Sequence, residues 1–394
     1  MMTLVRILVL AAATWLSPCA AEVVPAAPLT SAAAPAAEFG RRFVGYLKTD
    51  SDQQAEKGLE LVDAWLQAWN PEPALDIASQ LQGYRRAVAY YRIATQLARA
   101  GRREAALQTR VLGDAAGNGV LDHEIQEIAA SRAEALAATG ELARARDALA
   151  AIVAPVVRLQ TEARFFEFEP IDQLDARVRE FASRAGRVPS QAGKAELFAA
   201  RTLLDAGDLA AGRALLDSAF EAIARRADVE TVPLLHRTVR LYLLAGDLEA
   251  ARRCAEALSG FAARTDPLAY WKARDMRLAA ESFYAIGDGK MAGAFLDRIP
   301  NLVNRLDAHS LGRGGSEAAL AFLLQGQPDQ FHAAARHILL RLRGHAHHRA
   351  RAMSGIDVLT AYIQSGVPLV EAVAKELEET ARSIEVDPAY IHPG

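Results

Sequence analysis

The chain has very few cysteines, and this limits what can stabilise its fold. Two occur in 394 residues, Cys19 and Cys254. Cys19 lies in an N-terminal segment that we expect to be removed, which leaves one cysteine and no internal disulfide. Stability must then come from packing, even in an oxidising compartment. Cys254 follows a helical pattern, and we interpret it as a small buried apolar residue.

Lysine is also scarce, and no strong net charge is present. Lysine and arginine total 45, of which six are lysine, and the formal net charge is −3. A nearly balanced chain argues against bulk binding to nucleic acid. The preference for arginine favours bidentate contacts to carboxylate or phosphate, although this bias alone identifies no ligand.

Long apolar runs are absent after the first residues. The segment Met1–Arg6 carries one positive charge, and Ile7–Leu16 is an apolar run too short to span a bilayer. Ser17–Ala21 then places small residues at the −3 and −1 positions of a cut after Ala21. This pattern predicts a secretory signal peptide over residues 1–21, and therefore a periplasmic or secreted protein.

A second interpretation of the N-terminus is a lipoprotein anchored through Cys19. Leu16–Cys19 resembles a lipobox, but Pro18 replaces the small residue that this motif requires. The next stretch, 22–38, is rich in proline and alanine and has no apolar period, so we predict an extended tether. We expect the folded part at 39–384 and a short tail at 385–394.

Motifs of catalysis and cofactor binding are also missing. The chain lacks G-x-S-x-G, H-E-x-x-H, the phosphate-binding P-loop and C-x-x-C. The glycine-rich stretch Ser310–Leu320 has no preceding strand, so we predict a loop with Ser316 as helix N-cap. The aromatic stretch Phe165–Pro170 is interpreted as packing at an irregular turn, with ligand contact as the alternative. We predict no cofactor.

Five of the nine histidines gather near the C-terminus. Their spacing does not place three or four ligands together, as zinc or copper requires, so we predict a solvated basic face and no metal site. These histidines are His332, His337, His345, His347 and His348.

Strand signals are nearly absent, and helical patterns repeat with a regular period. Glycines in polar breaks are separated by 39, 67, 39, 41, 39 and 40 residues, which is the mark of a helical repeat. A large apolar residue stands four positions before each glycine, and a small one usually stands seven before. Aspartate follows three of the glycines as a predicted N-cap. The glycines are Gly101, Gly140, Gly207, Gly246, Gly287, Gly326 and Gly366.

This pattern of small residue, large residue, Gly-Asp, leucine and small residue resembles the tetratricopeptide repeat. The likeness covers most of 84–380, but the period is near 40 rather than the family's 34. The family's tryptophan and proline are not consistently present. We therefore expect an all-α, right-handed superhelical solenoid of antiparallel, tetratricopeptide-like helix hairpins.

The resemblance implies that the first helix of each hairpin lines a concave surface. Positions about thirteen, ten, six and three before each glycine then form the inner face, since they share one side of a helix. On a chain that is slightly acidic overall, these positions give a predominantly basic track. The candidate binding residues are Lys194, Arg201, His236, Arg240, Arg274, Arg277, Tyr284 and Arg313.

Three functions remain open from the sequence. The first is a non-catalytic scaffold that holds a protein or peptide, in particular an acidic one, in its groove. The second is a solenoid that binds an acidic glycan in envelope or polysaccharide assembly, and the third is an enzyme with unrecognised residues. Exposed aromatic platforms would favour glycan, a row of arginines would favour carboxylate or phosphate, and a convergent pair of acids would favour an enzyme.

Overall fold

All secondary structure in the described part of the chain is helical, which confirms the all-α class. The computed structural model describes residues 34–48, 51–117, 122–185, 188, 193–226, 228–266, 271–303, 306–344, 347–387 and 390. The predicted signal peptide and Cys19 lie outside these residues. No helix in the described ranges is long and apolar enough to cross a membrane.

The predicted tether over 22–38 is wrong at its end, because α2 (Ala34–Tyr46) already begins there. Alanine is the best helix former, and Pro35 stands in the first turn, where proline is tolerated. Phe43 and Val44, both fully buried, fix this helix against its neighbours. Packing of the later residues therefore extends the helix back into the alanine-rich stretch.

Consecutive helices pack in pairs, and the chain divides into two compact units. Unit 1 is built from the two ends of the chain, 1–118 and 299–394, with the short segment 268–273. Besides α2, its helices are α3 (Ser51–Gln67), α4 (Pro71–Gln80), α5 (Gly83–Arg99), α6 (Arg103–Ala116), α17 (Ile299–Val303), α18 (Ala308–Leu324), α19 (Pro328–Arg343), α20 (His348–Ser365) and α21 (Glu371–Glu385). Within this unit α5 pairs with α6, and α18 pairs with α19.

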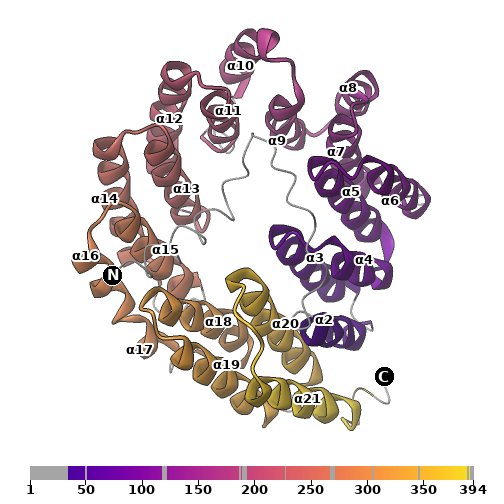
Figure 1. The fold of residues 1–394 in the computed structure, drawn as a ribbon, viewed down its shortest axis with the longest axis vertical. Helices are drawn as coiled ribbons and strands as arrows, with labels where there is room; N and C mark the ends of the chain where they lie inside the picture. Colours follow the sequence, from indigo (N-terminus) through magenta and orange to yellow (C-terminus); the bar gives the residue numbers. More distant parts are fainter. Residues whose placement is uncertain are drawn as a thin grey trace. The chain divides into compact units, whose positions relative to one another are not determined.

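Unit 2 is the middle of the chain, 119–267 and 274–298. Here α7 pairs with α8, α11 with α12 and α13 with α14 (Figure 1). Its helices are α7 (Asp122–Ala138), α8 (Leu142–Ala150), α9 (Pro155–Phe165), α10 (Ile171–Ala185), α11 (Lys194–Asp205), α12 (Leu209–Ala224), α13 (Thr231–Leu244), α14 (Leu248–Arg264), α15 (Trp271–Ala285, from Arg274 onward) and α16 (Gly289–Leu296), with a 3₁₀ turn η1 at Phe166–Phe168.

The glycine turns have the predicted geometry. All seven glycines adopt positive φ, as Gly246 does at +72°, a conformation that costs glycine little. After Gly246, the amide of Asp247 donates to the carbonyl of Tyr242, and the Asp247 side chain accepts from the Ala250 amide. The same cap is formed by Asp208 and Asp288. Each glycine therefore ends one helix, and in these three turns an aspartate starts the next.

The positions before the glycines are buried as predicted. The small residues Ala200 and Ala280 are fully buried, and so is Val239 at the same position before Gly246. Three residues further along, Leu203 and Tyr242 fill the adjacent turn with at most 3% exposure. The small residue permits close approach of a partner helix, and the large one fills the space beside it. Cys254 is fully buried too, and burial raises the pKa of its thiol.

The predicted loop at Ser310–Leu320 is wrong. This stretch lies within α18, which is capped by Asp307, and Ser316 is a buried residue inside the helix. A Cβ at Gly312 would meet Ser354, and one at Gly315 would meet Ile338. The glycines therefore allow neighbouring helices to approach α18 closely, and this packing outweighs the low helix propensity of glycine.

The aromatic stretch near Phe165 packs at an irregular turn, as predicted. Phe165 and Phe166 are buried, and Phe166 forms an edge-to-face contact with Phe181. Glu169, which ends the turn, is also buried and forms ion pairs with Arg146 and Arg177. These contacts engage Phe165, Phe166 and Glu169 within the fold.

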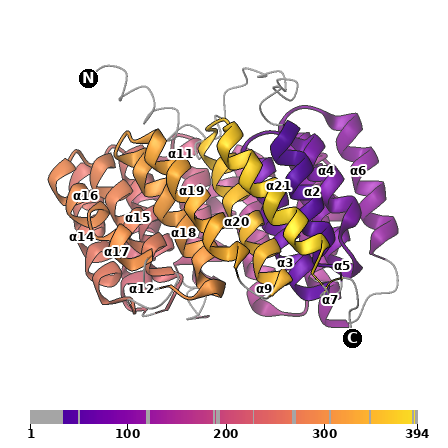
Figure 2. The ribbon, with the colours of Figure 1, turned by 90° about the horizontal axis from the view of Figure 1, so that it is seen from below.

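Within unit 1 the first helices of the described residues pack against the last. Figure 2 shows α2 and α3 beside α20 and α21; α2 contacts both α20 and α21, and α3 contacts α20. At the centre, Lys57 Nζ lies 2.7 Å from Asp357 Oδ1, and both side chains are less than a tenth exposed. In a linear repeat array each repeat contacts only its neighbours. Here contacts also join segments 300 residues apart.

Candidate functional site

The candidate site lies in unit 2, on the layer formed by the first helices of the hairpins. Helix α11 contacts both α9 and α13, and α12 and α14 form the second layer behind them (Figure 1). Side chains of α13 also reach α15, where His236 Nδ1 lies 3.0 Å from Ser282 Oγ. We call the following group the basic face: Arg164 on α9, Phe198 and Arg201 on α11, Arg237 and Arg240 on α13, and Arg277 on α15.

The first centre of the basic face is built around Phe198. The Arg237 guanidinium carbon lies 4.0 Å from the centre of the Phe198 ring, and that of Arg164 lies 5.6 Å away. Such cation–π contacts hold a guanidinium in place without neutralising it. Burial, with the nearby charges of Arg201 and Arg164, lowers the pKa of Arg237 to about 10. Arg237 is therefore still cationic at neutral pH, among two other cations.

The second centre is built around Glu281 on α15. Its carboxylate forms an ion pair with Arg277, one helical turn earlier, and lies 3.4 Å from Nε2 of His236. Burial by itself raises the pKa of Glu281, but the charges of Arg277 and Arg240 and the hydrogen bond from Arg277 lower it more. Glu281 is therefore ionised at neutral pH. The pKa of Arg240 is lowered mainly by burial, with Glu281 opposing this and Arg277 adding to it.

His236, which lies beside Glu281 at the second centre, is held neutral. Burial, together with the charges of Arg240 and Arg277, lowers its pKa to about 4, in spite of the opposing charge of Glu281. Its side chain is 12% exposed, with one ring nitrogen near Ser282 and the other near Glu281. His236 therefore acts as a neutral hydrogen-bonding group at physiological pH.

The basic face carries more positive than negative charge. Its five arginines stand against three carboxylates, and the pairs are Arg164 with Glu134, Arg201 with Asp205 and Arg277 with Glu281. Arg237 and Arg240 form no ion pair with any residue in the described ranges. These two residues are one turn apart on α13, so the surplus cations lie side by side.

The structure brings some of the eight predicted residues together and places the others elsewhere. His236, Arg240 and Arg277 converge around Glu281, and Arg201 lies near Arg237. The others lie elsewhere: Lys194 pairs with Glu230, Arg274 binds Asp275 and the Val229 carbonyl, Tyr284 is half-buried on α15, and Arg313 belongs to unit 1 and pairs with Glu60.

Sequence reasoning missed Phe198, Arg237 and Arg164. The signal for two of them was present, because Phe198 and Arg237 each stand nine residues before a repeat glycine. That position lies four after the thirteenth and three before the sixth, so it shares the same helical face. Arg164 lies in the long interval between Gly140 and Gly207, where no glycine marks the phase.

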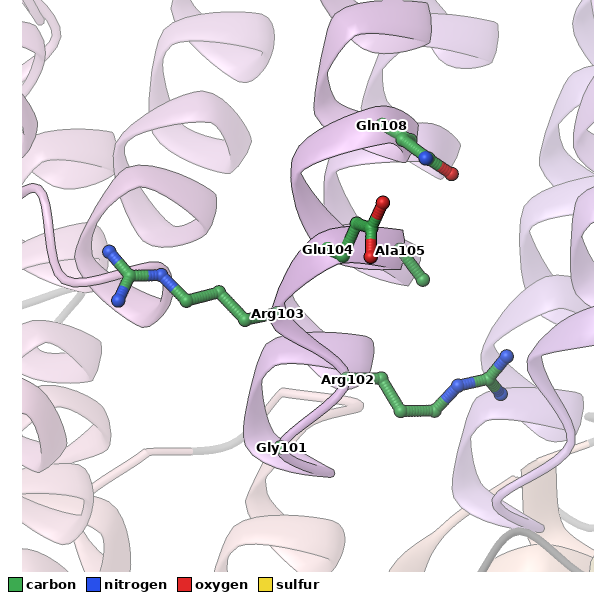
Figure 3. Close-up of a pocket in the computed structure, with 6 residues that line it drawn as sticks. All are labelled: Gly101, Arg102, Arg103, Glu104, Ala105 and Gln108. Carbon is green, nitrogen blue, oxygen red and sulfur yellow. The ribbon is translucent and has the colours of Figure 1, made fainter.

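Two other regions do not form a comparable site. In the described ranges no group of three or more His, Cys, Asp or Glu could hold a metal ion, and His332 instead lies 2.7 Å from the Tyr362 hydroxyl. A surface hollow at the start of α6 is lined by Gly101–Ala105 and Gln108. Arg102 and Arg103 extend from it in opposite directions, as Figure 3 shows, and Arg102 pairs with Glu72.

The comparisons with known proteins give no relative. A scan against protein-family models finds no match, and a search of curated proteins finds none either. The function must therefore be argued from the site itself.

Proposed function

We propose that the protein is a non-catalytic binding scaffold that holds an acidic polypeptide on the basic face of unit 2. The observation that carries this proposal is the pair Arg237 and Arg240, two neighbouring cations without a carboxylate partner in the described ranges. Arginine binds carboxylates through bidentate, charge-assisted hydrogen bonds, and these are stronger than neutral ones. A ligand that supplies carboxylates would complete the charge pattern of this face.

The fold supports a scaffold of the tetratricopeptide-like kind. Paired helices, glycine turns and the burial of the small positions are the features that such a solenoid needs. In this reading the hairpins continue into a right-handed superhelix with a period near 40 residues, and the first helices form its ligand-binding surface.

An acidic glycan is the second candidate, and the aromatic side chain of the site argues against it. Sugar rings stack on exposed aromatic faces, but Phe198 already carries the guanidinium groups of Arg237 and Arg164. A convergent pair of acids would favour an enzyme, whereas the charged and polar groups around Glu281 are Arg277, Arg240 and the neutral His236. Both observations favour binding of carboxylate groups over the other functions.

The predicted signal peptide leads to a proposal about where in the cell the protein works. We propose that residues 1–21 direct the chain out of the cytoplasm, that cleavage leaves Glu22 as the first residue, and that the scaffold works in the periplasm or outside the cell. Intact mass of the exported protein tests this. A diacylglyceryl mass on Cys19 would replace it with the lipoprotein alternative.

The binding proposal is tested with a fluorescein-labelled octaglutamate peptide and an oligogalacturonate of equal charge. We expect the peptide to bind more tightly, and the double variant R237Q/R240Q to lose about tenfold in affinity, or about 1.4 kcal/mol. The control is R225Q/R253Q, which removes two exposed arginines of the same unit, one at the C-cap of α12 and one on α14. If both double variants lost the same affinity for the peptide, the peptide would bind through nonspecific charge attraction and the proposed site would be wrong.

A further inference from the structure

The two centres of the basic face differ in whether the chain already fills them with a carboxylate. At the first centre, Arg237 lies on Phe198, while Arg201 and Arg164 are each paired with an acid of their own. No carboxylate in the described part of the chain pairs with Arg237. Arg237 at the first centre is therefore a cation without a carboxylate partner in these ranges.

The second centre holds a carboxylate of the protein itself. Glu281 accepts from Arg277, lies near His236 and contributes to the electrostatic environment of Arg240. Its side chain is 21% exposed, so solvent reaches this position. The carboxylate of Glu281 therefore has the same neighbours that a carboxylate of the ligand would have if it bound at the second centre.

The spacing of the centres matches an extended acidic peptide. Arg237 and Arg240 are three residues apart on one helix, so their Cβ atoms are about 5–6 Å apart. In an extended peptide, residues two apart point to the same side and are separated by roughly 6.5–7 Å. Two glutamates with one residue between them would therefore reach both arginines.

We infer that Glu281 is an internal competitor, which occupies the second centre in place of the second carboxylate of a Glu-x-Glu ligand. This inference rests on the proposed function and adds its ligand pattern and its regulation. Binding of one carboxylate at Arg237 leaves Glu281 in place. Binding of two requires Glu281 to leave Arg277, so that the second carboxylate takes its place beside Arg240, and this exchange lowers the affinity for the second carboxylate.

The test is the variant Glu281→Gln, which keeps the shape of the side chain and removes its charge. Two labelled alanine-based peptides serve as probes, one with a single glutamate and one with Glu-Ala-Glu. We expect E281Q to bind the Glu-Ala-Glu peptide about three- to tenfold more tightly, and the single-glutamate peptide with a change of about twofold or less. Adding R240Q to E281Q should remove the gain.

The matched control is Glu249→Gln, which makes the same charge change on α14, where Glu249 pairs with the exposed Arg253. It should leave both affinities unchanged. An equal gain in E249Q, or a weaker affinity in a folded E281Q, would overturn the competitor role while the proposed function stands. If neither peptide bound any variant, the proposed function itself would fall, and the inference with it.

Discussion

Lys57 and Asp357 form a buried ion pair across 300 residues of sequence, with 2.7 Å between Nζ and Oδ1. Glu60 accepts a second bond from Lys57 and also lies 3.3 Å from Arg313. The four charges balance, and they join α3 to α18 and α20 within unit 1. The first helices of the chain are therefore tied to the last by polar as well as apolar contacts.

Removing one member of this pair should be costly. Lys57→Met leaves the Asp357 carboxylate buried without its cation, and we expect a loss of about 3–5 kcal/mol in the free energy of unfolding at neutral pH. Burial already raises the pKa of Asp357 in the folded protein although Lys57 opposes this, and we expect the loss of Lys57 to raise it further. The loss should therefore shrink as pH falls and the carboxyl group takes up a proton.

Urea unfolding of K57M at pH 8 and pH 5 checks this expectation. The exposed Lys48→Met is the matched control and should have little effect. The double variant K57M/D357N should recover part of the stability. A K57M loss that is small, or that is the same at both pH values, would show that the pair contributes little to this contact.

The pH dependence of unit 2 should carry the signature of His236. Its folded pKa of about 4 lies below the usual value of 6.5. Between these values the unfolded chain binds a proton that the folded chain does not, so stability falls as pH falls through this window. From pH 7 to pH 5 the loss from this residue should be about 2 kcal/mol at most.

This effect is isolated by comparing the wild type with His236→Gln. The difference in unfolding free energy between the two should change with pH from 7 to 5, while Glu281 stays ionised. The pKa values of His332 and His348 are also lowered, and their contributions cancel in the comparison. A difference independent of pH would mean that His236 is not held neutral by the fold.

The repeat phase predicts which alanines tolerate enlargement. Ala200→Leu or Ala280→Leu places a large side chain at a fully buried helix contact, and overpacking should cost about 1–3 kcal/mol. Ala210→Leu makes the same change at an exposed position of α12 and should cost little. Unfolding midpoints in urea give the comparison, and equal midpoints for A200L, A280L and A210L would contradict the assigned contacts.

The helix pairs were predictable because their signals are local. A glycine, the small residue seven before it and the large residue four before it set the turn and the buried stripe of each hairpin, and the structure has all three. The ion pairs of Arg201 with Asp205 and of Arg277 with Glu281 could also have been predicted from the sequence, because the two residues of each pair are one helical turn apart.

Other features depended on neighbours that periodicity does not identify. The contact of Lys57 with Asp357 joins distant segments, and no local pattern marks it. In α18, Gly312 favours a loop by propensity but lies against Ser354 in a close helix contact. The charge of Arg237 is not balanced because its neighbours are the ring of Phe198 and two arginines that are each paired with another acid.

Binding of an acidic polypeptide at Arg237 and Arg240 is tested most directly by the protection of these arginines from chemical modification. The protein is treated with phenylglyoxal with and without octaglutamate, and the modified arginines are identified by mass spectrometry. We predict that the peptide protects Arg237 and Arg240 and leaves Arg225 and Arg253 as reactive as before, with the protection lost at high salt. Bound peptide without protection of Arg237 and Arg240, or with equal protection of Arg225 and Arg253, would contradict the claim.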